Sequence, residues 1–347
     1  MSNSSFYVNE IKNFGVDVEY WSIGKILGFP SYFSSEKYTN LNVENYEALK
    51  NNISEQDKST LFNVQIWDNK QISKTLELFN DKITSFFSIS RLPQSTIFQL
   101  RRPIINWLFN NRITKRNILF KCGGKKEYLV ESSQEIGIID YNYYYKDKII
   151  AYNNGSNYGL FIDEGIPHHP DFESNIGKDF NFIANNRSKI SKQYKLLLNG
   201  LFKKIEDWYG IKIIIALHPQ SKYSSYDFED RESITGSTPE LVKGSQFVIG
   251  HCSTAISLAV IHKKPIIIIS PDFLKVKALS KISRAYCNAL GIDMTSHSIF
   301  SSMKKPNLDL DEKLYKKYIN DYFCDLKNPS NTYTPKELTN FILNINP

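Results

Sequence analysis

The chain has 347 residues, which is long for one core and suits two domains of about 150 residues each. Its composition, 41% hydrophobic, 14% aromatic and 23% charged, is that of a folded globular protein and excludes a largely disordered chain. Lys and Arg exceed Asp and Glu only by 43 to 36, a mild excess that fits anionic ligands or a membrane surface but is no signature of nucleic-acid binding.

The sequence predicts a cytoplasmic protein. Its N-terminus has neither the basic nor the apolar segment of a signal peptide, and no apolar run approaches the roughly 18 residues that a membrane span needs. The four cysteines are scattered and form no CxxC pair, which is typical of a reducing compartment.

The first half, residues 1–152, predicts an α/β domain on the acceptor side of the molecule. Segments with strand-like alternation follow segments with apolar residues at three- and four-residue steps, and this order favours a mostly parallel sheet. The expected strands are 16–21, 59–67, 83–89, 118–120 and 136–141, and the expected helices are 42–50 and 68–80. The half contains no glycine-rich phosphate loop with the required spacing.

One segment of this half is strongly basic. Residues 82–126 hold ten Lys and Arg and neither Asp nor Glu. Two interpretations stay open for it. The segment is either an amphipathic face that docks on anionic lipid or a charged glycan, or a helix with Trp107 and Phe109 buried and a solvated basic rim.

The turn-forming residues 153–157 are the best linker candidate, so the second domain is expected to span 153–347. All six histidines follow this linker, which indicates that the second half carries the chemistry. Its apolar, β-branched runs predict buried parallel strands. The expected strands are 160–162, 211–217, 247–249 and 265–269, and the expected helices are 188–209 (closed by Gly210), 255–262 and further helices near the C-terminus.

Polar side chains follow each of these strands. The strand ends are Asp163-Glu164, His218-Pro219, Ser253-Thr254 and Ser270. Because ligands of an open parallel sheet bind in the crevice outside the carboxyl ends of the strands, the four endings together predict a ligand site there.

The residue types at these ends suit a phosphate and a proton transfer. Ser253 and Thr254 stand where a helix begins, so hydroxyls and backbone N–H groups can hold a phosphate there; a plain helix cap by Ser253 is the alternative. His218 can hydrogen-bond or protonate a departing phosphate oxygen, or it is a structural donor. Asp163 or Glu164 can take a proton from an attacking hydroxyl as general base.

A polar loop between two of the strands is a further candidate. Gly236, Ser237 and Thr238 form it, with Thr238 expected to cap a short helix and Pro239 at the first helical position. Glu240 lies one turn into that helix, where it either accepts hydrogen bonds from ribose hydroxyls or is a solvated first-turn acid.

A metal site and a hydrolase triad are not indicated. His168, His169 and Asp171 are candidate ligands, but adjacent histidines of a strand point to opposite sides and no cysteine or HExxH partner accompanies them. No GxSxG motif occurs, and the acidic pair lacks the DxD arrangement of metal-dependent sugar-nucleotide sites. We therefore expect neither a metal nor a cofactor.

Three short motifs occur in a fixed order: an acidic pair followed by glycine (163–165), an HP dipeptide (218–219) and a Ser-Thr pair (253–254). In this combination the chain resembles bacterial sialyltransferases of the GT-B fold, over residues 158–272. The resemblance implies two Rossmann-like domains whose parallel sheets face a central cleft. It also implies inverting, metal-independent transfer of an acidic ulosonic sugar (sialic, legionaminic, pseudaminic acid or Kdo type) from its CMP donor to a surface glycan or lipid-linked acceptor.

Residue by residue, the resemblance implies that Asp163 is the general base and that His218 binds or protonates the CMP phosphate. Ser253 and Thr254 would hold that phosphate. For the donor carboxylate the candidates are Arg231, Lys222 and Arg187, each of which is otherwise an ordinary surface charge. The sequence leaves four other functions open: a GT-B transferase with a UDP-sugar donor, one with a CDP-alcohol donor, a sugar-nucleotide epimerase, and a non-catalytic nucleotide- or glycan-binding module.

Overall fold

A computed structural model describes most of the second half of the chain and parts of the first. The described residues are 12–13, 15–23, 26, 40–57, 60–63, 78–79, 83–88, 117–122, 133–136, 149–153, 155–168, 183, 185–219, 221–274, 276–296, 304–323 and 343–344. The chain forms two compact units. The first comprises Met1–Ile89, Arg101–Ile139 and Cys324–Pro347, and the second Ser90–Leu100 and Asp140–Phe323. The division into domains 1–152 and 153–347 stays a prediction.

The first unit contains a parallel sheet of four strands paired in chain order. They are β3 (Leu61–Asn63), β4 (Ile83–Ser88), β5 (Asn117–Cys122) and β6 (Ser133–Ile136). A separate parallel pair comprises β1 (Tyr20–Ser22) and β2 (Asn40–Asn42). The predicted α/β class and parallel pairing are thus confirmed for this half.

Helix α2 (Tyr46–Glu55) packs its buried Leu49 and Ile53 with Phe79 in the core of this unit. It begins later than predicted because the Asn45 side chain caps it, accepting a hydrogen bond from the N–H of Ala48 at 2.9 Å. The predicted helix 68–80 lies outside the described residues except for 78–79, as do the side chains of the basic segment 82–126.

The second unit is built on a sheet of six parallel strands in the order β12-β11-β10-β7-β8-β9. The strands are β7 (Tyr158–Ile162), β8 (Lys212–Leu217), β9 (Ser233–Thr235), β10 (Val248–Gly250), β11 (Ile266–Ser270) and β12 (Met294–Ser296). The chain lays down β7, β8 and β9 in one direction and then returns to place β10 on the other side of β7. This is the Rossmann order, with its topological switch point between β7 and β10.

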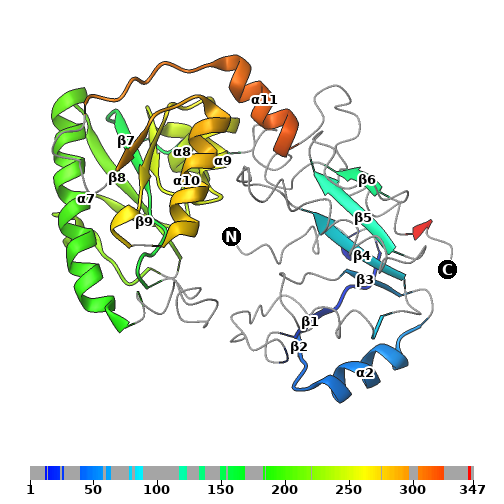
Figure 1. Cartoon of the computed structure of the whole chain (residues 1–347). Coiled ribbons are helices and arrows are strands. Elements are labelled where there is room, and N and C mark those ends of the chain that lie inside the picture. Colours follow the sequence, from blue (N-terminus) through cyan, green and yellow to red (C-terminus); the bar gives the residue numbers. More distant parts are fainter. Residues whose placement is uncertain are drawn as a thin grey trace. The chain divides into compact units, whose positions relative to one another are not determined.

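Helices cover both faces of this sheet (Figure 1). Helix α7 (Arg187–Tyr209) lies on one face, and α8 (Thr238–Gly244), α9 (Ile256–Ile261) and α10 (Lys277–Leu290) lie on the other. Helix α11 (Glu312–Tyr322) packs on α9 and α10. Since both faces are covered, the inner strands β7 and β11 are buried and apolar along nearly their whole length, as their sequences predict.

The strands and helices predicted for this half are confirmed to within one or two residues. Gly210 ends α7 with a left-handed φ of 67°, as expected of a C-cap glycine. Two details differ. Ser237, not Thr238, is the N-cap residue of α8, because the helix already begins at Thr238. The two edge strands, β9 and β12, were not predicted, since their Ser-Ile-Thr and Met-Thr-Ser sequences carry no apolar run.

No helix in the described residues has both the length and the apolarity to cross a lipid bilayer.

Two leucines of α7 provide a matched test of the core. Leu201 is fully buried, whereas Leu196 is 73% exposed on the same helix. We expect Leu201→Ala to lower the free energy of unfolding by about 2–5 kcal/mol, because it leaves a cavity against the sheet. Leu196→Ala should change it by less than about 0.5 kcal/mol. Urea unfolding followed by circular dichroism measures both, and equal losses would contradict the placement of α7.

Candidate active site

The candidate site lies at the switch point of the second sheet. Strands β7 and β10 are paired neighbours there, and the chain leaves their carboxyl ends in the turns 163–165 and 251–254. On its other side β7 pairs with β8, which ends at His218. The sheet order therefore brings the three predicted strand ends to adjacent positions on one edge, where ligands of such sheets bind.

The Glu164 carboxylate joins the ends of β7 and β10. Its Oε1 accepts hydrogen bonds from the backbone N–H groups of His251, Cys252 and Ser253, at 3.1, 2.7 and 2.7 Å. The Cys252 thiol donates to Oε2 at 3.0 Å. Successive N–H groups that converge in this way form an anion-binding nest, and here the anion is the protein's own carboxylate. Glu164, expected as an alternative general base, thus makes structural hydrogen bonds in this structure.

Buried groups around the nest hold it in place. The pKa of the Cys252 thiol lies well above its ordinary value, because of burial and the charge of Glu164, so Cys252 is a hydrogen-bond donor and not a nucleophile. The His251 side chain is fully buried, with Nδ1 2.8 Å from the carbonyl oxygen of Ile269 and Nε2 3.0 Å from the Tyr194 hydroxyl. A carbonyl only accepts, so Nδ1 carries a proton and donates it to Ile269.

Neither His251 nor Tyr194 was singled out from the sequence. His251 could have been identified from the sequence, because it directly follows Gly250 at a strand end. No sequence pattern identifies Tyr194, because it occupies an ordinary core position of α7.

Asp163 is almost fully buried, with 2% of its surface exposed. Its Oδ1 accepts from the N–H of Gly165 at 2.9 Å and its Oδ2 from the N–H of His218 at 3.2 Å. Burial raises the pKa of this carboxyl above its ordinary value of 3.8, with a smaller contribution from the charge of Glu164. The hydrogen bonds from Ser221, Gly165 and His218 act in the opposite direction. Asp163 is therefore a carboxylate with increased proton affinity beside the HP motif.

Gly165 lets the turn after the acidic pair lie against His218. Its φ of +65° is in the left-handed region that favours glycine, and a Cβ there would lie 3.7 Å from both Cβ and Nδ1 of His218. The imidazole thus lies beside the 163–165 turn, and it is only partly buried. Pro219 follows it as an exposed residue.

Ser253 and Thr254 lie in the turn before α9. The Ser253 hydroxyl accepts from the N–H of Ala255 at 3.1 Å, which leaves its own proton available for donation. Thr254 is exposed. The N–H groups of His251, Cys252 and Ser253 are bound to Glu164. Those of 255–257, at the start of the helix, are bound to Ser253 or Thr254, so the groups left for an anion are mainly the two hydroxyls.

Residues 236–240, which comprise the loop before α8 and the start of that helix, follow β9, the strand next to β8. A Cβ on Gly236 would meet nothing within 4 Å, and the Ser237 side chain makes no capping hydrogen bond. Glu240 is partly buried, and its Oε2 is enclosed without a hydrogen-bond partner in the described part of the protein. An enclosed carboxylate oxygen of this kind suits a hydroxyl donor from a ligand.

The candidates away from this edge have structural contacts. His168 packs edge-to-face on Tyr223, with ring centres 5.5 Å apart, while His169 and Asp171 lie outside the described residues. Arg231 forms a bidentate ion pair with Glu206, with N–O distances of 2.9 and 2.8 Å. Arg231 is thus bound within the protein. Among the described residues, no three His, Cys, Asp or Glu side chains gather where they could hold one metal ion.

No protein-family model matches the sequence, and no curated protein shows significant sequence similarity to it. Solved structures of similar arrangement include the calicheamicin glycosyltransferase CalG4, 9% identical, with 99% of this chain and 90% of that one covered and a TM-score of 0.47. A variant of the wall teichoic acid polymerase TagF is 13% identical, with 96% and 83% covered and a TM-score of 0.45. The UDP-GlcNAc 2-epimerase of Methanocaldococcus jannaschii is 12% identical, with 97% and 90% covered and a TM-score of 0.41.

The Glu164 nest gives a stability prediction. Glu164→Ala leaves three backbone N–H groups without their acceptor, and we expect it to lower the free energy of unfolding by roughly 2–4 kcal/mol. The matched control is Glu312→Ala, which removes an exposed carboxylate from surface ion pairs of 3.7 and 3.9 Å. Glu312→Ala should lower the free energy of unfolding by about 0.5 kcal/mol or less. Urea unfolding of both variants measures the difference; similar losses would contradict the role of Glu164.

Proposed function

We propose that the protein is an inverting, metal-independent glycosyltransferase that moves an acidic ulosonic sugar from its CMP donor to a glycan or lipid-linked acceptor. One observation carries the proposal: the acidic pair, the HP dipeptide and the Ser-Thr pair meet at the switch point. Asp163 is hydrogen-bonded to the backbone of His218, and Glu164 to that of Ser253. These contacts support one site for the three motifs, because Glu164 and Ser253 are 89 residues apart in the chain.

The donor phosphate binds at the hydroxyls of Ser253 and Thr254 and at the imidazole of His218. The Ser253 hydroxyl has its proton free to donate, and Thr254 is exposed beside it. The imidazole gives a proton or a hydrogen bond to the phosphate oxygen as the bond from the anomeric carbon to that oxygen breaks. CMP departs with the electron pair of that bond, so stabilisation of its phosphate supplies most of what the leaving group needs.

Asp163 is the general base. The acceptor hydroxyl attacks the anomeric carbon from the face opposite to CMP, and its proton passes to the Asp163 carboxylate. The raised pKa of Asp163 supports this role, because a base works best when its proton affinity approaches the operating pH. Direct displacement at the anomeric carbon inverts its configuration.

Two further groups complete the donor site. Glu240 accepts hydrogen bonds from the ribose hydroxyls with its enclosed, unpartnered Oε2, and the loop residues 236–238 lie beside it. Glu164 is a positioning residue, because its carboxylate fixes the turn that carries Ser253 relative to the strand that carries Asp163. It acts through the backbone and transfers no proton.

Nucleotide selectivity tests the donor class. We expect CMP to raise the melting temperature by several degrees, since a ligand at 100 times its Kd stabilises the folded state by about 2.7 kcal/mol. UDP at the same concentration should raise it markedly less. Differential scanning fluorimetry with both nucleotides measures this, with Glu240→Gln as the variant that should lose part of the CMP effect. Equal or greater stabilisation by UDP would overturn the CMP assignment, and donor turnover without any acceptor would indicate an epimerase.

Substitution of the base separates chemistry from binding. Asp163→Asn should lower kcat by roughly 10²- to 10⁴-fold, the usual contribution of a general base, while the affinity for CMP changes little. Asp230→Asn, on an exposed left-handed turn that asparagine tolerates, is the matched control and should keep full activity. Both variants are tested in transfer assays over a panel of CMP-ulosonic acids, and their affinity for CMP is measured by calorimetry. Full activity of Asp163→Asn would remove it as the base.

The raised pKa of Asp163 also predicts a pH dependence. Its proton binds more tightly in the folded than in the unfolded chain, so this contribution to stability is fully present below pH 3.8 and is lost as the pH rises through the folded pKa. The unfolding free energy of the wild type should therefore fall relative to Asp163→Asn over that window, and kcat/KM should rise over it. Urea titrations at a series of pH values measure the two unfolding free energies. A wild type that becomes more stable relative to Asp163→Asn as the pH rises would contradict the raised pKa of Asp163.

A further inference from the structure

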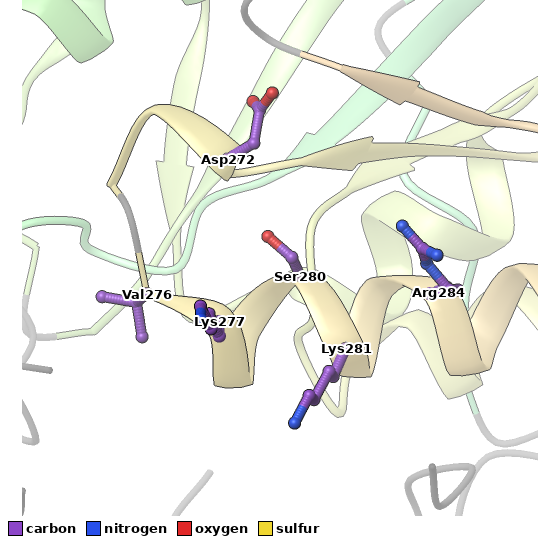
Figure 2. Close-up of a pocket in the computed structure, with 6 residues that line it drawn as sticks. All are labelled: Asp272, Val276, Lys277, Ser280, Lys281 and Arg284. Carbon is purple, nitrogen blue, oxygen red and sulfur yellow. The ribbon is translucent and has the colours of Figure 1, made fainter. Parts of the chain in front are cut away.

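Helix α10 has two sides with different surroundings. One side, together with η4 (Asp272–Leu274), lines a pocket of about 470 Å³ (Figure 2). The lining residues are Asp272, Val276, Lys277, Ser280, Lys281 and Arg284. The buried side carries Ser283 and Tyr286, which are three residues apart and therefore share a face of the helix. Both side chains are fully buried, and each donates a hydrogen bond to the turn 251–253 of the candidate site.

These two hydrogen bonds hold carbonyl groups of the turn. The Ser283 hydroxyl donates to the carbonyl oxygen of His251 at 2.8 Å, and the Tyr286 hydroxyl donates to that of Ser253 at 3.1 Å. The N–H groups of the same turn are bound to the Glu164 carboxylate. The turn is therefore fixed from two directions, by the end of β7 through its N–H groups and by α10 through its carbonyl groups.

The Tyr286 hydroxyl is itself held in place by α11. A carbonyl only accepts, so the proton of this hydroxyl goes to Ser253, and its oxygen accepts the hydrogen bond from the Tyr318 side chain. The two tyrosine rings are stacked with their centres 6.2 Å apart, and both are buried. A buried phenol with two such partners has little freedom to turn, so Tyr286 is a fixed donor to the Ser253 carbonyl.

The bond from Tyr286 also sets the direction of the peptide unit between Ser253 and Thr254. A trans peptide unit is planar, so its C=O and N–H groups point in opposite directions. Because the Ser253 carbonyl is turned towards Tyr286, the N–H of Thr254 points away from it. Thr254 is exposed, and its N–H donates no hydrogen bond within the part of the chain that the structure describes. This N–H is therefore available to an anion beside the two hydroxyls.

We propose that Tyr286 is a positioning residue of the donor site, with Ser283 as a second contact from the same helix. The inference rests on the proposed function, in which Ser253 and Thr254 hold the donor phosphate. Tyr286 touches no ligand; it acts through the Ser253 carbonyl, which fixes the two hydroxyls and the Thr254 N–H relative to the phosphate. A binding site needs its donors placed to within about 0.5 Å, so loss of this contact should weaken phosphate binding and leave the binding of base and ribose unaffected.

Comparison of a nucleotide with its nucleoside isolates the phosphate. CMP and cytidine are titrated calorimetrically into the full chain, and the ratio of their affinities measures what the phosphate contributes. We expect Tyr286→Phe, which keeps the ring and removes the hydroxyl, to lower this ratio by about three- to tenfold, the usual net contribution of one hydrogen bond. The affinity for cytidine should not change. Ser283→Ala should lower the ratio in the same direction, and it replaces Tyr286→Phe if melting curves show that the latter does not fold.

The matched control is Tyr315→Phe. Tyr315 is also buried, and its hydroxyl donates to a backbone carbonyl, that of Lys264, at 2.8 Å. Both variants therefore lose one bond from a buried tyrosine hydroxyl to the main chain, and both should lower the melting temperature. Only Tyr286→Phe should lower the ratio of the CMP and cytidine affinities. An unchanged ratio in the α10 variant, or an equal fall in Tyr315→Phe, overturns the inference.

The outcomes separate this inference from the proposed function. A wild type that binds UDP and not CMP overturns the proposed donor, and the ratio of the UDP and uridine affinities in the same variants then decides the role of Tyr286. A wild type that binds no nucleotide, or binds nucleosides as tightly as their nucleotides, overturns both proposals. In transfer assays Tyr286→Phe should raise the KM for the donor and leave the KM for the acceptor unchanged. A rise in the acceptor KM alone overturns the inference.

Discussion

The bridge from Glu164 to the 251–253 turn sets the geometry of the whole site. At the switch point the chain leaves β7 and β10 in different directions, so the N–H groups of this turn have no ladder partner and need an acceptor. The Glu164 carboxylate supplies it with three N–H bonds and one from the Cys252 thiol. Because Glu164 directly follows Asp163, the same bridge fixes Asp163 relative to Ser253.

Two neighbouring carboxylates thus have different environments. Glu164 accepts three backbone N–H bonds from one turn, whereas Asp163 accepts two and is almost fully buried. Burial dominates at Asp163 and raises its pKa. Glu164 is therefore suited to hold the turn in place, and Asp163 is suited to accept a proton. This difference comes from the surroundings of the two side chains.

The sequence predicted the four inner strands of the second unit, β7, β8, β10 and β11, well because each is buried on both faces and is therefore one apolar run. The strand ends, with Asp163, His218 and Ser253, were predictable for the same reason. The hydrogen bonds that join these strand ends were not predictable from the sequence. The contact between Glu164 and His251 spans 87 residues, and no local pattern reports it. Nor does the sequence show that the Glu164 carboxylate occupies the N–H groups of residues 251–253.

The occupied nest has a consequence for substrate binding along this edge of the sheet. At a switch point, a nest of backbone N–H groups can supply positive potential for an anion, but here the Glu164 carboxylate neutralises it. Attraction for an anionic ligand at this strand end then has to come from side chains, such as the partly buried imidazole of His218 beside the 163–165 turn. Side chains can place their polar groups at different distances from the sheet, whereas a backbone nest is tied to its strand end.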